Sequence, residues 1–132
     1  MKVLLTGGEG FIGSWTKQVL LDRGHTVLSL TNQKYADREQ PEGVTVFLGD
    51  IRDEVTVTEA MAHSEGFIHL AGVLGTAETI FNPRPAARTN IIGGLNVSIP
   101  NESARNLLSQ PSNLRPIRFT SALLTSSPRM QS

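Results

Sequence analysis

Three glycines spaced three residues apart, Gly7, Gly10 and Gly13, separate an apolar run from a segment with helical periodicity. The run over residues 2–6 predicts a strand that is buried on both faces. In such a turn the first glycine permits a sharp bend, the second lets a pyrophosphate approach the backbone, and the third allows close helix packing. Because free amide groups and the helix dipole favour anions at a helix start, the pattern predicts a dinucleotide-binding turn. The same residues could also form a tight turn in an α/β domain that binds no nucleotide.

The residues after this turn predict a helix with one apolar side. Charged and polar side chains lie largely off that side, and Gly24 is placed to end the helix in the left-handed conformation. The apolar side is expected to pack in the interior and consists of Ile12, Trp15, Val19 and Leu20.

Apolar runs alternate with helical patterns over the rest of the first 97 residues. Further strands are predicted at 27–30, 44–48 and 66–70. A helix is predicted at 53–63, with Asp53 as its cap and with Val55, Thr58 and Ala62 on one side. A loop and then a second helix, from Pro83 and Pro85 to about Val97, follow the last of these strands. Such alternation is typical of parallel βαβ units, so we expect a Rossmann-type, three-layer α/β sandwich with strand order 3-2-1-4-5.

The composition of the chain changes near residue 97. All 12 glycines lie at or before Gly94, whereas residues 97–132 hold four of the seven prolines, eight serines and one acidic residue. We therefore expect a nucleotide-binding domain at 1–97 and a Ser/Pro-rich tail at 98–132, in which residues 117–121 could form the fifth strand.

Charge and composition argue against several classes of protein. The 12 basic and 12 acidic side chains balance, whereas nucleic-acid and anionic-membrane partners both require a basic surface. Without cysteine there is no disulfide, Cys-ligated metal or Cys nucleophile. His63 and His69 bring no third ligand, so no metal site is predicted. The first apolar run is too short for a signal peptide or a membrane span, and we expect a cytoplasmic protein.

Four segments follow one another in a fixed order: Thr-Gly-Gly-Glu-Gly-Phe-Ile-Gly-Ser at 6–14, Gly-Asp-Ile-Arg-Asp at 49–53, His-Leu-Ala-Gly at 69–72 and Asn-Ile-Ile-Gly-Gly at 90–94. Together they resemble the extended short-chain dehydrogenase/reductases, and within them the NAD-dependent epimerase/dehydratase branch, over about residues 1–97. The resemblance implies NAD or NADP as cofactor and a nucleotide sugar as substrate. In intact members the cofactor takes a hydride from a sugar carbon and returns it, or the reaction continues to elimination. Homo-oligomer formation stays open.

The resemblance also implies a set of cofactor-binding residues. The carboxylate of Asp50 would accept from the adenine amine while Ile51 packs on the ring, and Asn90 would support the active site. From the residues alone, Asp50 could simply end a turn and Asn90 could lie on a helix surface. The full set of candidate positions is Gly7, Gly10, Phe11, Ile12, Gly13, Thr31, Asn32, Asp50, Ile51, Leu70, Ala71, Gly72 and Asn90.

Thr31 and Asn32 occupy the place where this family usually has an aspartate that binds the adenosine ribose and repels a 2′-phosphate. A threonine forms one hydrogen bond without that repulsion, and Lys34 and Arg38 lie close by in sequence. The sequence therefore favours neither NAD(H) nor NADP(H) over the other as the cofactor. The alternative for the two cations is an ordinary solvated loop.

The catalytic residues that the resemblance implies do not occur in the 132 residues. The family uses a tyrosine with a lysine four positions later, but the one tyrosine here is Tyr35 and no lysine follows Lys34. The chain thus resembles the first half of an enzyme, as a truncation or a shifted reading frame would produce. Its function stays open between an NAD(P)-binding part of a nucleotide-sugar epimerase/dehydratase, a catalytically inactive cofactor-binding or interaction module, and a fragment that folds poorly.

Overall fold

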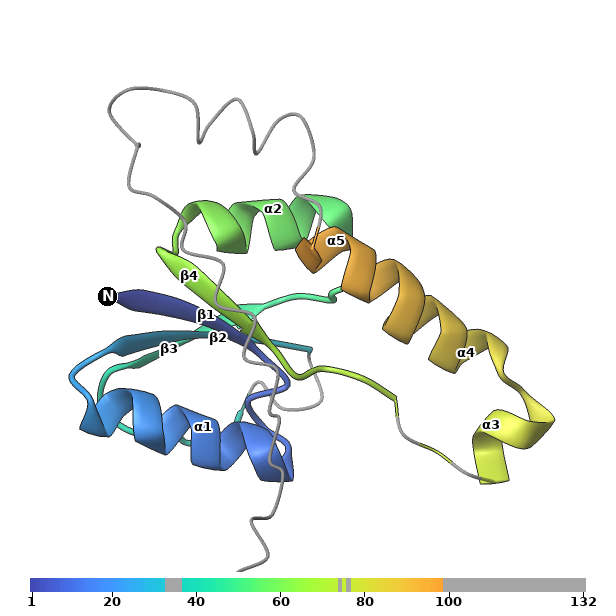
Figure 1. Cartoon of the computed structure of the whole chain (residues 1–132), viewed down its shortest axis with the longest axis horizontal. Coiled ribbons are helices and arrows are strands. Elements are labelled where there is room, and N and C mark those ends of the chain that lie inside the picture. The colour runs from blue at the N-terminus through green and yellow to red at the C-terminus, as the bar shows by residue number, and fades with distance from the viewer. Residues whose placement is uncertain (33–36, 74, 76, 99–132) are drawn as a thin grey trace, which may run out of the picture.

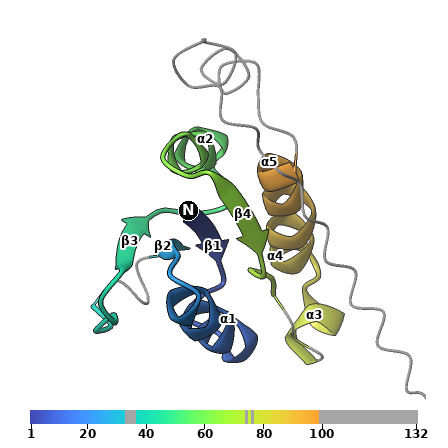
Figure 2. The same cartoon turned by 60° about the vertical axis from the view of Figure 1, so that its left-hand side comes forward.

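The computed structural model describes residues 1–32, 37–73, 75 and 77–98. It shows a parallel four-stranded sheet with helices on both faces (Figures 1 and 2). Its strands β1 (Lys2–Thr6), β2 (Thr26–Thr31), β3 (Val44–Leu48) and β4 (Gly66–His69) are ordered β3-β2-β1-β4. The predicted α/β fold and the order of these four strands are confirmed. The tail and its proposed strand at 117–121 lie outside the described residues.

Strands β1 and β2 form the buried centre of the sheet. Val3 pairs with Val27 and Leu5 with Ser29, and all four of these residues are at most 5% exposed. Both strands are covered on both faces, as expected for a parallel sheet between two helical layers. This burial explains why their sequences are nearly continuous apolar runs.

Helices α2 (Glu54–Ala62) and α5 (Gly94–Ser98) cover one face of the sheet, as Figure 2 shows. Asp53 caps α2 as predicted, since the backbone amide of Val55 donates to Asp53 Oδ1 at 3.1 Å. Of the three residues that were predicted to share one side of α2, Thr58 is buried, whereas Val55 and Ala62 are exposed. The core on this face consists of Leu4, Leu28, Leu30, Ile51, Val57, Ala60, Met61 and Val97.

Helix α1 (Phe11–Asp22) covers the other face, but the prediction of its buried side is wrong. Ile12 and Trp15 are each 66% exposed, while Gly13 and Lys17 are buried. Gly13 lets the start of α1 approach the turn closely, and buried Lys17 has acceptors beneath the helix. Gly24 ends the helix as predicted, with φ of +78°.

The predicted helix after Pro83 is continuous but not uniform. It consists of α4 (Arg84–Ala87), the π-helix η2 (Arg88–Gly93) and α5. The predicted loop before it contains a short helix, α3 (Ala77–Phe81), which at five residues is too short to show an apolar period. None of the helices in the described ranges combines the length and apolar character that a membrane-crossing helix needs.

Candidate functional site

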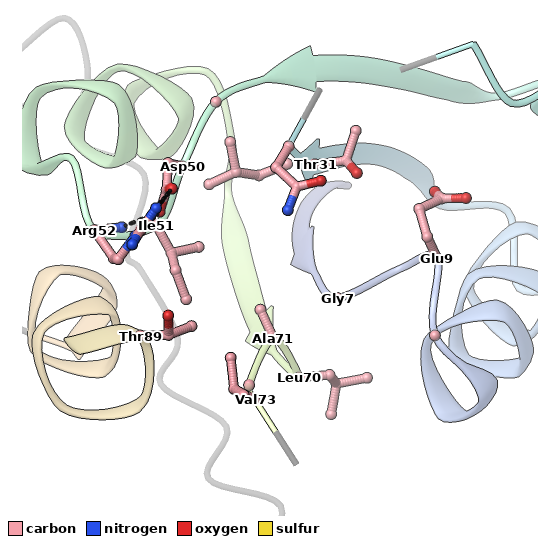
Figure 3. A pocket seen from close by; sticks show the side chains of 15 residues that line it. Gly7, Glu9, Thr31, Asp50, Ile51, Arg52, Leu70, Ala71, Val73 and Thr89 are labelled. Carbon is pink, nitrogen blue, oxygen red and sulfur yellow. Dashed lines mark hydrogen bonds and ion pairs between the residues drawn. The ribbon is translucent and has the colours of Figure 1, made fainter. Parts of the chain in front are cut away.

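A pocket of about 430 Å³ opens where the four strands end (Figure 3). Its walls come from the glycine turn (residues 7–10) after β1 and from the residues that follow β2, β3 and β4. In an open parallel sheet a crevice forms where connections leave neighbouring strands toward opposite faces, here β1 and β4. The candidate residues that line the pocket are Gly7, Gly10, Thr31, Asn32, Asp50, Ile51, Leu70, Ala71 and Gly72.

The glycine turn leads directly into a helix without a side-chain cap. The amide of Gly10 donates to the carbonyl oxygen of Gly7 at 3.1 Å, which closes the turn. Gly10 is extended and is the N-cap of α1, and the first intrahelical bond runs from Ser14 to its carbonyl oxygen at 2.9 Å. Because the first amides of a helix have no intrahelical acceptor, those of Phe11, Ile12 and Gly13 can bind an anion. These three residues are not part of the pocket lining itself.

Two of the three glycines are required by backbone packing. Gly7 has φ of +72°, and a Cβ there would lie 2.6 Å from the backbone of Leu70 and of Ala71. A Cβ at Gly13 would lie 2.0 Å from the Gly7 carbonyl oxygen, so Gly13 permits contact with the turn rather than with the strand. A Cβ at Gly10 would lie 3.4 Å from that same oxygen, so the fold does not demand a glycine there. Its predicted role beside a pyrophosphate stays a prediction.

The residues after β3 bring a carboxylate and an apolar side chain to the pocket. Arg52 donates to Asp50 Oδ1 from its backbone amide at 2.9 Å and from Nε at 3.0 Å. These hydrogen bonds hold the pKa of Asp50 below its usual value, so the carboxylate accepts hydrogen bonds at neutral pH. Ile51 is buried beside it, and its carbonyl oxygen accepts from Asn96 Nδ2 at 2.9 Å.

Thr6 holds the segment after β4 against the end of β1. Its Oγ1 accepts from the amides of Leu70 and Ala71, both at 3.2 Å, and lies 2.6 Å from His69 Nδ1. Burial lowers the pKa of His69, which favours the neutral imidazole. Leu70 and Ala71 are thereby fixed beside Gly7, on the side of the pocket opposite Asp50 (Figure 3).

Asn90 does not line the pocket. From η2 its Oδ1 accepts from the Val73 amide at 2.8 Å and its Nδ2 donates to the Val73 carbonyl oxygen at 3.1 Å. It therefore positions the segment that follows β4. The role of Asn90 in binding a cofactor stays a prediction.

Six further residues line the pocket that sequence reasoning did not assign: Glu9, Leu30, Gly49, Arg52, Val73 and Thr89. Glu9 and Arg52 lie inside two of the quoted motifs, so position in a motif was an available signal. Nothing local marks Val73 or Thr89, because only the fold brings η2 beside the end of β4. Within the described residues, no three His, Asp or Glu side chains gather as metal ligands would.

The comparison with protein families matches residues 3–99 to the model described as the NAD dependent epimerase/dehydratase family. A UDP-glucose 4-epimerase of Klebsiella pneumoniae is 40% identical over 105 residues, which cover 72% of this chain and 76% of that one. A UDP-glucose 4-epimerase of Corynebacterium glutamicum is 32% identical over 96 residues, which cover 72% of this chain but 29% of that one.

Among solved structures, the UDP-glucose 4-epimerase of Thermus thermophilus in complex with NAD matches with a TM-score of 0.68 and 35% identity. The match covers 81% of this chain and 34% of that one. The Thermotoga maritima UDP-glucose 4-epimerase with UDP-glucose matches with a TM-score of 0.65 and 29% identity, over 74% of this chain and 32% of that one. The chain thus spans about a third of these longer relatives.

Proposed function

Because the chain belongs to the NAD dependent epimerase/dehydratase family, we propose that its pocket binds NAD. The observation that carries the proposal is the convergence of three binding features on one pocket. The glycine turn lines the pocket and leads into the uncapped start of α1, whose amides can bind a pyrophosphate. Asp50 and Ile51 suit an adenine ring, and the end of β2 suits a ribose.

The charges around the pocket favour an uncharged base beside Asp50 and an anion beside the start of α1. Asp50 is paired with Arg52, so its carboxylate can accept from an exocyclic amine without an uncompensated charge. The first turn of α1 contains no acidic residue, and its dipole favours a diphosphate. The residues present therefore fit the adenosine diphosphate half of the cofactor.

We further propose that this dinucleotide serves hydride transfer to and from a nucleotide sugar, as the names of the relatives suggest. Bound NAD supplies a nicotinamide ring that accepts and returns a hydride. The described residues hold and orient the cofactor: Thr6 fixes the β4 end of the pocket and Asn90 fixes Val73.

Cofactor binding without turnover is the second candidate. The specific observation in its favour is that the 132 residues contain one tyrosine, Tyr35, and no lysine after Lys34. Tyrosine and lysine four positions apart, which the family resemblance implies for proton transfer, are therefore not available in this chain. Incubation with NAD and UDP-glucose separates the two candidates, because only the first gives UDP-galactose.

Calorimetric titration of the full chain with NAD tests the binding proposal, with Gly10→Ala as the variant. We expect saturable binding by the wild type and affinity reduced by about tenfold or more in Gly10→Ala, because the methyl group stands where the pyrophosphate approaches the turn. Stability should hardly change, since Gly10 is extended and its Cβ has room. Gly94→Ala is the matched control, because a Cβ there meets nothing within 4 Å. A wild type that does not bind NAD at millimolar concentration contradicts the proposal.

A further inference from the structure

Glu9 lies in the glycine turn and lines the pocket, yet its side chain is only 8% exposed. Three donors approach one of its carboxylate oxygens, Oε1. They are Lys17 Nζ at 2.7 Å, Gln40 Nε2 at 3.1 Å and Ser29 Oγ at 3.4 Å. The donors come from α1, from the segment before β3 and from β2. Glu9 is thus a fixed part of the pocket wall rather than a mobile surface side chain.

The second carboxylate oxygen of Glu9, Oε2, differs from Oε1 in its hydrogen bonding. None of the hydrogen bonds within the described residues ends on Oε2, and Arg38 Nη1 lies 4.0 Å from it. No fully buried side-chain nitrogen or oxygen in that part of the chain lacks a partner, which is consistent with an Oε2 that is open to solvent. Glu9 lines the pocket, and its carboxylate lies on the side of the pocket where Thr31 ends β2 (Figure 3).

The charge on Glu9 and its rigidity give Oε2 a defined chemistry. The Lys17 ion pair is as buried as Glu9 itself, with both side chains 8% exposed, and it holds the carboxylate in one orientation. A carboxylate accepts hydrogen bonds but cannot donate them, so Oε2 attracts a hydroxyl group and repels a phosphate. The residue at the end of β2 that often performs this task in dinucleotide-binding folds is here the neutral Thr31.

We propose that Glu9 Oε2 accepts a hydrogen bond from the adenosine ribose 2′-hydroxyl and thereby selects NAD(H) over NADP(H). This inference rests on the proposed function, because it requires a dinucleotide in the pocket. Glu9 from the turn after β1 takes over the discrimination that an acidic residue at the end of β2 would otherwise provide. Lys17, Gln40 and Ser29 act as positioning residues, since they leave Oε2 as the oxygen that faces the ligand.

Arg38 is the neighbouring group that could reverse this selectivity. Its guanidinium donates to the Glu9 carbonyl oxygen at 3.3 Å and would attract a 2′-phosphate. Its side chain is 55% exposed, however, and solvent and salt screen an exposed charge more than a buried one. The buried carboxylate therefore outweighs the exposed cation.

The test compares NAD and NADP affinities by calorimetry in the wild type, in Glu9→Gln and in the control variant Glu59→Gln. We expect the wild type to bind NAD more tightly than NADP. In Glu9→Gln the ratio of the NAD affinity to the NADP affinity should fall by at least about tenfold, since a hydrogen bond to a charged group is worth about that factor. Glu59→Gln makes the same change of charge at an exposed residue of α2 that does not line the pocket, so it should leave the preference intact. The ratio of the two affinities is decisive, because damage to the turn alone weakens both cofactors equally.

Each outcome has a distinct meaning. If the wild type binds neither dinucleotide, the proposed function fails. If it binds both and Glu9→Gln leaves their ratio unchanged, or if the wild type prefers NADP, the role of Glu9 is refuted while dinucleotide binding stands. If Glu9→Gln does not fold, the double variant Glu9→Gln/Lys17→Met, which removes both charges of the buried pair, is used and must show the same loss of preference.

Discussion

The contact between Gly13 and the glycine turn makes a specific prediction for Gly13→Ala. The added Cβ would lie 2.0 Å from the Gly7 carbonyl oxygen, 2.7 Å from Gly8 Cα and 2.8 Å from the Gly7 carbonyl carbon. All three atoms belong to the backbone, so no side-chain rotation can relieve the overlap. Either the first turn of α1 or the glycine turn itself must move by about 1.5 Å to restore ordinary contact distances of about 3.5 Å.

The magnitude follows from two opposing effects. Overpacking of this kind costs about 3 kcal/mol, at the upper end of the usual range because only backbone can yield. Alanine gains about 1 kcal/mol over glycine in a helix, which offsets part of that cost. We therefore expect Gly13→Ala to lower the free energy of unfolding by about 2 kcal/mol, a factor of about 30 in the unfolding equilibrium constant.

Urea unfolding followed by circular dichroism measures this difference. With a slope of about 2 kcal/mol per molar urea, the midpoint should fall by about 1 M while the slope stays constant. Gly94→Ala is the matched control, because its Cβ meets nothing within 4 Å and the site is helical, so its midpoint should stay or rise. A Gly13→Ala midpoint within about 0.2 M of the wild type, equivalent to about 0.4 kcal/mol, would show that close contact with the turn does not matter.

Two further predictions concern the hydrogen bonds at the end of β1. Thr6→Val keeps the shape of a fully buried side chain but removes the acceptor for the Ala71 amide, so the free energy of unfolding should fall by about 2 kcal/mol. The control Thr26→Val, at an exposed position, should change the free energy of unfolding by less than about 0.5 kcal/mol. Equal effects of the two variants would contradict the role of Thr6 Oγ1. Burial lowers the pKa of His69 below its usual value of 6.5, so in this pH range the folded state binds fewer protons than the unfolded state. The contribution of neutral His69 to stability is therefore fully present above pH 6.5 and is lost as the pH falls below that value. His69→Asn should weaken the dependence of the free energy of unfolding on pH between pH 8 and pH 5, whereas His63→Asn, at an exposed position, should leave it unchanged. A wild type whose free energy of unfolding is constant over that range would refute this linkage.

The candidate site was partly predictable from sequence because several of its constraints are local. A left-handed φ at Gly7 and a carboxylate directly after β3 follow from residues that are neighbours in the chain. The family resemblance implies that Asp50 and Ile51 bind the same ligand as the glycine turn, and the fold brings them to one pocket. The motif marks the position of Glu9, but its burial was not predictable, because that burial involves Gln40, which is 31 residues away.

The amino-acid sequence by itself determined the strands, the cap at Asp53 and the helix end at Gly24, because periodicity and backbone sterics act over a few residues. The parallel arrangement of the strands followed from their alternation with helices. Only the tertiary structure decided which side of each helix is buried. In α1 an ion pair with Glu9 allows Lys17 to lie inside while Trp15 stays outside, against the apolar pattern. The physical reason is that burying a charge is costly unless a partner meets it, and that partner is supplied by the fold rather than by the pattern of the helix.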